Sequence, residues 1–120
     1  MATQTETRHA GEFLISEMNG YGSREEVTIL SGQNLAAGSI LGKITSGGKY
    51  KAYDNALSDG AQSAAGILYD AVDASGGDKI AAVIVRNAEV DGDVINWGAM
   101  TGGDITAGVA DLLTLGIIVR

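Results

Sequence analysis

The sequence predicts a mainly β domain of short strands, with one short helix near the C-terminus and a flexible N-terminal arm. Three observations support this fold class. Short apolar runs recur at intervals of roughly 8 to 12 residues and are separated by clusters of Gly, Asn, Asp and Ser. Glycine accounts for 18 of 120 residues, which is about twice its usual share of roughly 7%. Only the stretch 103–115 has the spacing of an amphipathic helix.

The sequence predicts the arm over residues 1–24 and a single β-rich domain over residues 25–120. The arm begins with a polar lead, continues with an apolar patch at 13–15 and ends at a glycine-rich break, 19–23. Both a frayed terminus and a segment that pairs with another chain fit this pattern. Phe13, the only phenylalanine of the chain, favours pairing, because a free arm gains nothing by exposing it.

Within the domain, apolar runs predict strands at 26–30, 39–45, 49–53, 64–69, 79–86 and 117–119. Two glycines at 47–48 form the tip of a hairpin that joins the second and third runs. The small residues Ala64, Ala65 and Gly66 indicate that a backbone approaches something closely there. The run 79–86 is the most apolar and is expected to be buried on both faces.

The helix is predicted over 103–115. Its apolar residues follow a helical spacing of i, i+4, i+7 and i+8, namely Ile105, Val109, Leu112 and Leu113. Asp104 or Thr106 is expected to cap its start, and Gly116 is expected to end it.

The composition excludes several classes of function. The chain has 8 basic and 15 acidic residues, and its net charge of −7 argues against binding to nucleic-acid phosphates or to an anionic membrane surface. Because there is no cysteine, disulfides, thiolate metal sites and cysteine nucleophiles are excluded. Neither a transmembrane helix nor a signal peptide is expected, since the apolar stretches are short and the N-terminus is polar.

No catalytic, metal-binding or cofactor-binding residue is predicted. His9, the only histidine, lies in the polar lead without rigidly held partners for catalysis or metal binding. The run 38–44 is one residue too short for a phosphate-binding loop and has Ile44 where Ser or Thr would hold magnesium. The acidic turns 73–78 and 91–93 lack the ligand spacing of a calcium loop. The chain is therefore expected to act by binding or as a structural protein.

A series of motifs covers residues 35–120. The most specific is Asp59-Gly60 followed by Gly66-Ile67-Leu68. The other motifs are the runs 37–45, 48–50, 52–54, 64–65, 82–86, 90–97 and 115–119. In order and spacing, these motifs resemble the head decoration proteins of tailed bacteriophages, the lambda D-like family.

The resemblance implies a compact β domain of the β-clip type that assembles as a homotrimer. Such trimers sit on the outer surface of an expanded phage head, bind the major capsid protein and stabilise the head against internal DNA pressure. The resemblance implies no enzymatic activity, no cofactor, and no direct contact with nucleic acid or a membrane. The protein would be made in the host cytoplasm and would reside in the virion.

The resemblance also implies an arm that is mobile in the free protein and adds to a strand of the capsid protein. The candidate capsid-binding residues are Glu12, Phe13, Leu14, Ile15, Ser16 and Glu17. An extended segment would place Phe13 and Ile15 on one side and Leu14 on the other. Because a trimer carries three arms, the second and third attachments are intramolecular, so arms of modest affinity bind firmly together.

A second set of residues is a possible contact with another subunit or with the capsid, namely Ala64, Ala65, Gly66 and Trp97. Packing inside one subunit is the slightly favoured explanation for the three small residues, and core packing is the expected role of Trp97. The family pattern has a proline after this tryptophan, where Gly98 stands here.

Two other functions fit the sequence. One is a small β-clip domain that binds a ligand such as a carbohydrate, which requires a cleft lined by aromatic side chains, with the tyrosines as candidates. The other is an enzyme subunit whose active site forms only with a missing partner. A monomer that binds an oligosaccharide would favour the first of these.

Overall fold

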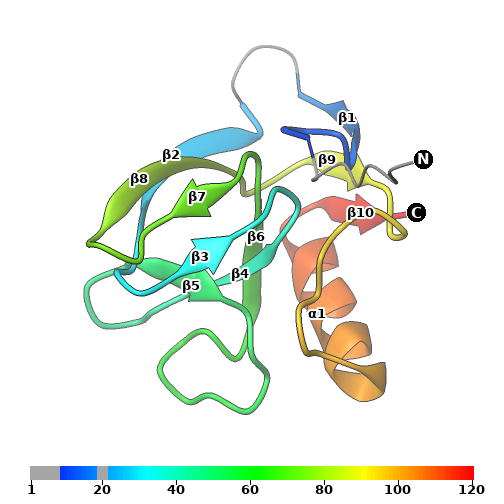
Figure 1. Ribbon diagram of the computed structural model, residues 1–120. Coiled ribbons are helices and arrows are strands. Elements are labelled where there is room, and N and C mark those ends of the chain that lie inside the picture. Colours follow the sequence, from blue (N-terminus) through cyan, green and yellow to red (C-terminus); the bar gives the residue numbers. More distant parts are fainter. Residues whose placement is uncertain (1–8, 19–21) are drawn as a thin grey trace, which may run out of the picture.

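The computed structural model describes residues 9–18 and 22–120, and it confirms a mainly β fold with one short helix near the C-terminus (Figure 1). Two predicted segments lie partly outside the described residues. These are residues 1–8 of the polar lead and residues 19–21 of the glycine-rich break. The β-clip arrangement and the mobility of the arm stay predictions.

Five strands close into a barrel, which occupies the left half of the view in Figure 1. In barrel order they are β2 (Arg24–Ile29), β5 (Tyr50–Ala52), β4 (Ile40–Lys43), β6 (Ala64–Leu68) and β8 (Lys79–Ile84). Buried side chains such as Ile29, Leu41 and Val83 form an apolar core inside it. A two-stranded pair made of β3 (Asn34–Leu35) and β7 (Val72–Asp73) packs Leu35 and Val72 against this core.

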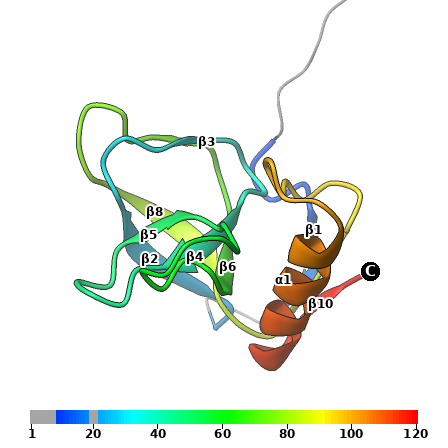
Figure 2. The ribbon, with the colours of Figure 1, turned by 90° about the horizontal axis from the view of Figure 1, so that it is seen from below.

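A three-stranded sheet and the helix α1 (Gly102–Thr114) make up the other half of the molecule (Figure 2). The sheet order is β1 (Leu14–Glu17), β9 (Ala88–Val90) and β10 (Ile117–Val119). Strand β1 runs antiparallel to β9, and β10 runs parallel to it. Fully buried side chains, among them Phe13, Leu112 and Ile117, form a second core that includes Ile84 of the barrel.

The predicted hairpin and its tip are confirmed. Strands β4 and β5 pair antiparallel, with Leu41 opposite Ala52 and Lys43 opposite Tyr50. Gly47 has φ +94° and Gly48 has φ +74°, a left-handed conformation that glycine adopts without steric cost. The turn chemistry of the sequence therefore located this hairpin correctly.

The prediction that 79–86 is buried on both faces is wrong for its first half. Ile80 is 72% exposed, whereas Val83 and Ile84 are fully buried. The register explains the difference, because β8 pairs with β2 along its whole length but with β6 only at Val83 and Ile84. Residues 79–82 of β8 therefore have no paired residue in β6, and the Ile80 side chain stays exposed.

The helix ends as predicted and begins differently. Gly116, with φ +83°, directly follows the C-cap residue and closes the helix. Asp104 and Thr106 both lie inside the helix, since it starts at Gly102, and no side chain caps its N-terminus. Among the described residues, no helix is both long and apolar enough to cross a membrane.

Candidate functional site

The segment predicted to bind a partner forms the edge strand of the three-stranded sheet. Strand β1 pairs with β9 on one side, and its other edge pairs with no strand of the described residues. Leu14 and Glu17 are partly buried, and Ile15 is 54% exposed. Glu12 and Ser16 are also exposed. An unpaired edge presents free backbone N–H and C=O groups, which are able to pair with a strand of another protein.

Phe13 and Ile15 do not share one side of this segment. Phe13 is fully buried in the second core, whereas Ile15 points outward. The reason is a bulge in β1: Leu14 pairs with Val90 and Ser16 pairs with the adjacent Glu89, so Ile15 is an extra residue without a partner in β9. Strict alternation, on which the prediction rested, fails at such a bulge.

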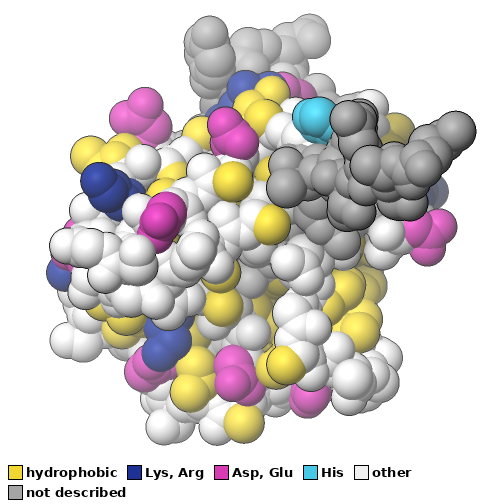
Figure 3. All heavy atoms as spheres, in the orientation of Figure 1, with side chains coloured by type: hydrophobic (Ala, Val, Ile, Leu, Met, Phe, Trp, Pro, Cys, Tyr) yellow, Lys and Arg dark blue, Asp and Glu magenta, His cyan; other side chains and the backbone are white. Residues whose placement is uncertain are grey.

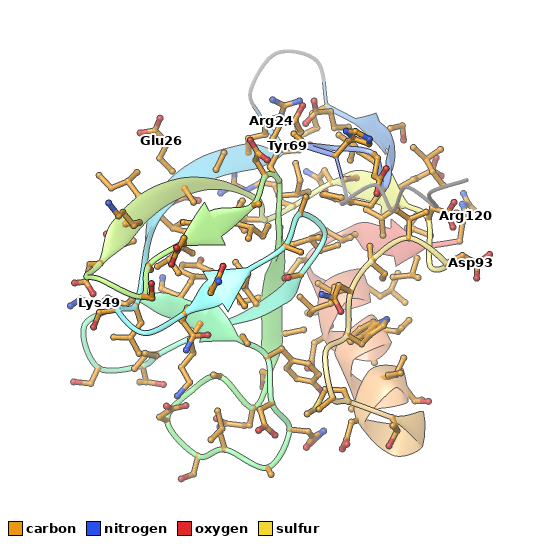
Figure 4. All side chains as sticks on the ribbon, viewed as in Figure 1. Arg24, Glu26, Lys49, Tyr69, Asp93 and Arg120 are labelled. Atoms are coloured by element: carbon orange, nitrogen blue, oxygen red, sulfur yellow. The ribbon has the colours of Figure 1, made fainter. Side chains whose placement is uncertain are left out.

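Polar and aromatic contacts hold the two ends of this segment to the barrel. At its C-terminal end, the Arg24 guanidinium donates two hydrogen bonds to the Glu17 carboxylate, of 2.6 and 3.0 Å. The same guanidinium lies over the ring of Tyr69, 4.1 Å from its centre, and Figure 4 shows these two side chains next to each other. At the N-terminal end, the Gly11 N–H donates to the Tyr69 carbonyl at 2.9 Å. These contacts fix the path of the chain on both sides of Phe13.

The outward face of the sheet carries a second polar group of side chains. The Glu89 carboxylate accepts hydrogen bonds from Arg120 and from the Ser16 hydroxyl, the latter at 3.1 Å. Both contacts hold the pKa of Glu89 below its ordinary value, with the Arg120 contact as the larger cause. The three strands of the sheet are thus linked across their exposed face through Ser16, Glu89 and Arg120.

The small residues at the start of β6 are explained by packing within this chain. A Cβ atom added to Gly66 would lie 2.6 Å from Cγ1 of Val83 and 2.9 Å from the carbonyl oxygen of Ile84. Ala64 is buried in the second core and Ala65 packs against the first. A contact between these residues and a neighbouring subunit stays a prediction.

Trp97 packs against α1 and lies beside Tyr53. The two rings meet edge to face, with their centres 6.0 Å apart. A Cβ atom on Gly108 of α1 would lie 2.4 Å from the Trp97 ring, so the glycine permits this contact. The Tyr53 hydroxyl donates to the Asp104 carbonyl at 2.7 Å, and burial is the main cause that raises the pKa of Tyr53. Trp97 and Tyr53 together fasten the helix to the barrel.

A cleft of about 320 Å³ opens between the barrel and the chain that leads into α1. Tyr53 and Trp97 line it together with polar residues that include Gln33, Lys51, Asp54 and Asn96. Sequence reasoning did not locate this cleft, because its residues come from β3, β4, β5, the loop after β5 and the loop before α1, which are spread over most of the chain. The sequence offered the tyrosines as candidates for lining a ligand cleft, and Tyr53 lines this one, but it assigned Trp97 to core packing.

In the two turns that were considered for calcium, Asp73 and Asp91 bond to their own loops, whereas Asp78 bonds to Ser31 and Lys49. Asp73 accepts from the Ser75 hydroxyl at 2.5 Å, and Asp91 accepts from the Asp93 N–H at 2.9 Å. Across residues 9–18 and 22–120, no three His, Cys, Asp or Glu side chains are placed to hold a metal ion together.

The family model described as bacteriophage lambda head decoration protein D matches residues 3–117. No curated protein sequence matches the chain significantly. The family match covers nearly the whole chain, including β1, the barrel and α1.

Proposed function

This chain belongs to the bacteriophage lambda head decoration protein D family, and from that premise we propose that it binds as a homotrimer to the outer surface of an expanded phage head. There it contacts the major capsid protein and stabilises the head against internal DNA pressure. Membership alone makes the chain a decoration protein of a phage head, in a family of structural proteins rather than enzymes. The family match over residues 3–117 is the observation that carries the proposal.

We assign attachment to residues 1–24 and the body of the trimer to residues 25–120. Strand β1 supports this assignment, since one of its edges is left unpaired by the described residues. A strand of the capsid protein that adds to this edge would extend the sheet to four strands without displacing Phe13 from the core. Ile15 and Ser16 would flank the added strand, because both are exposed.

A trimer strengthens such an attachment. One added strand of four to six residues supplies few contacts, and ordering the partner segment costs roughly 1–2 kcal/mol of backbone entropy per residue. Three edges on one trimer turn the second and third attachments into intramolecular steps, so the total affinity exceeds that of one edge by orders of magnitude. The contacts of Arg24 and Gly11 lower the cost further, because they hold β1 in its extended form before binding.

The charge distribution fits a protein partner better than DNA. Acidic and basic side chains are scattered over the face seen in Figure 3 and do not gather into a basic patch. With 8 basic and 15 acidic residues, the chain lacks the clustered cations that phosphate backbones require. Synthesis in the host cytoplasm and a final position on the outer head surface are consistent with this composition.

Binding to the head is tested with two matched isoleucines. Ile15 on β1 and Ile80 on β8 are both exposed, 54% and 72%, and lie on different sheets. We expect Ile15→Glu to abolish co-sedimentation with expanded heads that lack decoration protein, whereas Ile80→Glu binds normally. Both variants should stay folded, because neither side chain is part of a core.

Light scattering of the free protein tests the homotrimer separately. A monomer at micromolar concentration would contradict the trimer. If Ile15→Glu binds heads as well as the unchanged protein does, attachment through β1 is wrong. Heads saturated with the protein should also retain their DNA at a higher temperature than bare heads, and equal retention would contradict the stabilising role.

A further inference from the structure

The cleft between the barrel and the chain before α1 has no part in the proposed attachment. Residues of β3, of β5 and of the loop that enters α1 line it, and Figure 1 shows this loop on the α1 side of β3 and β5. Strand β1 contributes none of its lining residues. Its volume of about 320 Å³ falls near the lower end of the roughly 300–1,000 Å³ that is usual for small-molecule sites. The cleft therefore suits a small ligand.

Three polar side chains of the cleft are oriented by the backbone. Each uses one oxygen to accept a backbone N–H: Oε1 of Gln33 from Ala52 at 3.1 Å, Oδ1 of Asp54 from Ala56 at 3.0 Å, and Oδ1 of Asn96 from Gly98 at 2.9 Å. Because a backbone N–H requires an acceptor, these contacts also decide which atom of each amide is oxygen. The second polar atom of each side chain makes no hydrogen bond within the described part of the chain.

These second atoms define the ligand that fits. Gln33 and Asn96 each offer an amide N–H₂ group, which donates, and Asp54 offers a carboxylate oxygen, which accepts. Hydroxyl groups can both donate and accept, so a polyhydroxylated ligand satisfies all three side chains. Trp97, which lines the cleft with them, adds apolar surface that suits the C–H groups of a sugar.

Charge argues for a neutral ligand. Lys51, the cation of the cleft, pairs with Asp59 at 2.8 Å, and Asp54 would repel an anion. A purely apolar ligand would leave the amides and the carboxylate without partners, which disfavours its binding. A neutral ligand with several hydroxyl groups meets both requirements.

We propose that this cleft binds a neutral saccharide of one or two rings. This activity is independent of head attachment, because β1 takes no part in it. If the protein lies on the outer surface of a phage head, such a site would allow the head to bind sugars in its surroundings.

The full-length protein is titrated with glucose, galactose, N-acetylglucosamine, maltose, cellobiose and lactose, and Trp97 fluorescence is recorded. Trp97 is the only tryptophan of the chain, so its emission reports directly on the cleft. We expect a saturable change with at least one of these sugars, with a dissociation constant in the millimolar range. The side-chain amide signals of Gln33 and Asn96 in NMR spectra should shift over the same concentrations.

Isosteric variants test the assigned atoms. Asn96→Asp and Asp54→Asn keep the oxygen that bonds the backbone and change only the second polar atom. Each should weaken sugar binding about tenfold, as expected for the loss of one good hydrogen bond. The control is Asp93→Asn, which makes the same chemical change as Asp54→Asn but lies outside the cleft, near Arg120 in Figure 4, and should bind sugar unchanged.

Three results would overturn the proposal. The first is that none of the six sugars produces a saturable change. The second is that the sugar affinity of both cleft variants equals that of the control. The third is that acrylamide fails to quench Trp97 in the native assembly, which would show that a solute in the cleft does not reach its ring.

Discussion

Arg24 holds Glu17 through both oxygens of its carboxylate, at 2.6 and 3.0 Å, and so ties the end of β1 to the start of β2. The hydrogen bond to Glu17 is the main cause that raises the pKa of Arg24. A bidentate pair of this kind is stronger than a single contact, because two parallel N–H···O bonds also fix its geometry. The ring of Tyr69 lies against the same guanidinium, 4.1 Å away, and adds a cation–π contact.

Replacing Arg24 should therefore destabilise the protein. We expect Arg24→Ala to lower the free energy of unfolding by about 1–2 kcal/mol, from loss of the pair and of the ring contact. Urea unfolding at one fixed protein concentration measures this, since assembly makes apparent stability depend on concentration.

The matched control is Arg86→Ala. Arg86 pairs with Glu25 through one contact of 2.9 Å, and both side chains are about half exposed, 46% and 54%. Such a pair contributes about 0.5 kcal/mol or less. Arg86 also donates to the Gly22 carbonyl at 2.8 Å. Equal losses for the two variants would show that the second hydrogen bond to Glu17 and the Tyr69 ring together add no more than the exposed contact of Arg86 with the Gly22 carbonyl.

Gly66 and Gly76 should respond in opposite ways to alanine. The Cβ of Gly66→Ala would press against Val83 and the backbone of Ile84, so we expect a loss of about 1–3 kcal/mol. Gly76 has no atom within 4 Å of a built Cβ, so Gly76→Ala should leave stability unchanged or raise it by up to about 1 kcal/mol. Thermal unfolding compares the two, and a stable Gly66→Ala protein would contradict the packing described for β6.

The sequence predicted local structure well and long-range pairing poorly. Turn residues and apolar spacing located the β4–β5 hairpin and the end of α1 at Gly116. The same pattern identified Phe13 as an anchor but not its partner, because alternation is identical whether a strand joins its own sheet or another chain. The carbonyl of Phe13 accepts from the N–H of Asp91, a contact across most of the chain that no local signal encodes.

The candidate sites show the same limit. Ile80 is apolar by sequence, and only the barrel register reveals that nothing of the described chain covers it. The cleft is assembled from residues near 33, 54 and 97, so its donors and acceptors become a site only after the barrel closes. The bulge at Ile15 depends on its pairing with β9 and has no signature in the sequence.

Acid should destabilise the folded protein through four carboxylates. Hydrogen bonds lower the pKa values of Asp59, Asp73, Asp78 and Glu89 below the ordinary values of 3.8 for Asp and 4.5 for Glu. The folded state therefore binds fewer protons than the unfolded state in this range. The stabilisation is complete above the ordinary values and is lost as the pH falls through the lowered ones.

Asp78→Asn tests one of these groups. Asp78 accepts from the Lys49 ammonium at 2.6 Å, the main cause of its lowered pKa, and from the Ser31 N–H at 2.8 Å. The variant should unfold more easily at neutral pH and show a flatter decline of stability below about pH 4. Added salt should shrink the difference, because the pair is exposed to solvent. Asp93→Asn removes a carboxylate without an ion-pair partner among the described residues, so it should cost less stability at neutral pH than Asp78→Asn does.

Alanine substitution should also have different effects on stability at two glycines of α1. Alanine normally stabilises a helix by about 1 kcal/mol relative to glycine. Gly103 has open space around a built Cβ, so Gly103→Ala should gain part of this amount. A Cβ atom built on Gly108 would lie 2.4 Å from the Trp97 ring, and the same ring also contacts Tyr53 edge to face. Gly108→Ala must therefore displace the ring or the helix. We expect it to lose about 1 kcal/mol or more and to shift the Trp97 emission, whereas Gly103→Ala leaves the emission unchanged. If both variants gain stability with unchanged emission, the helix is not fastened to the barrel through Trp97.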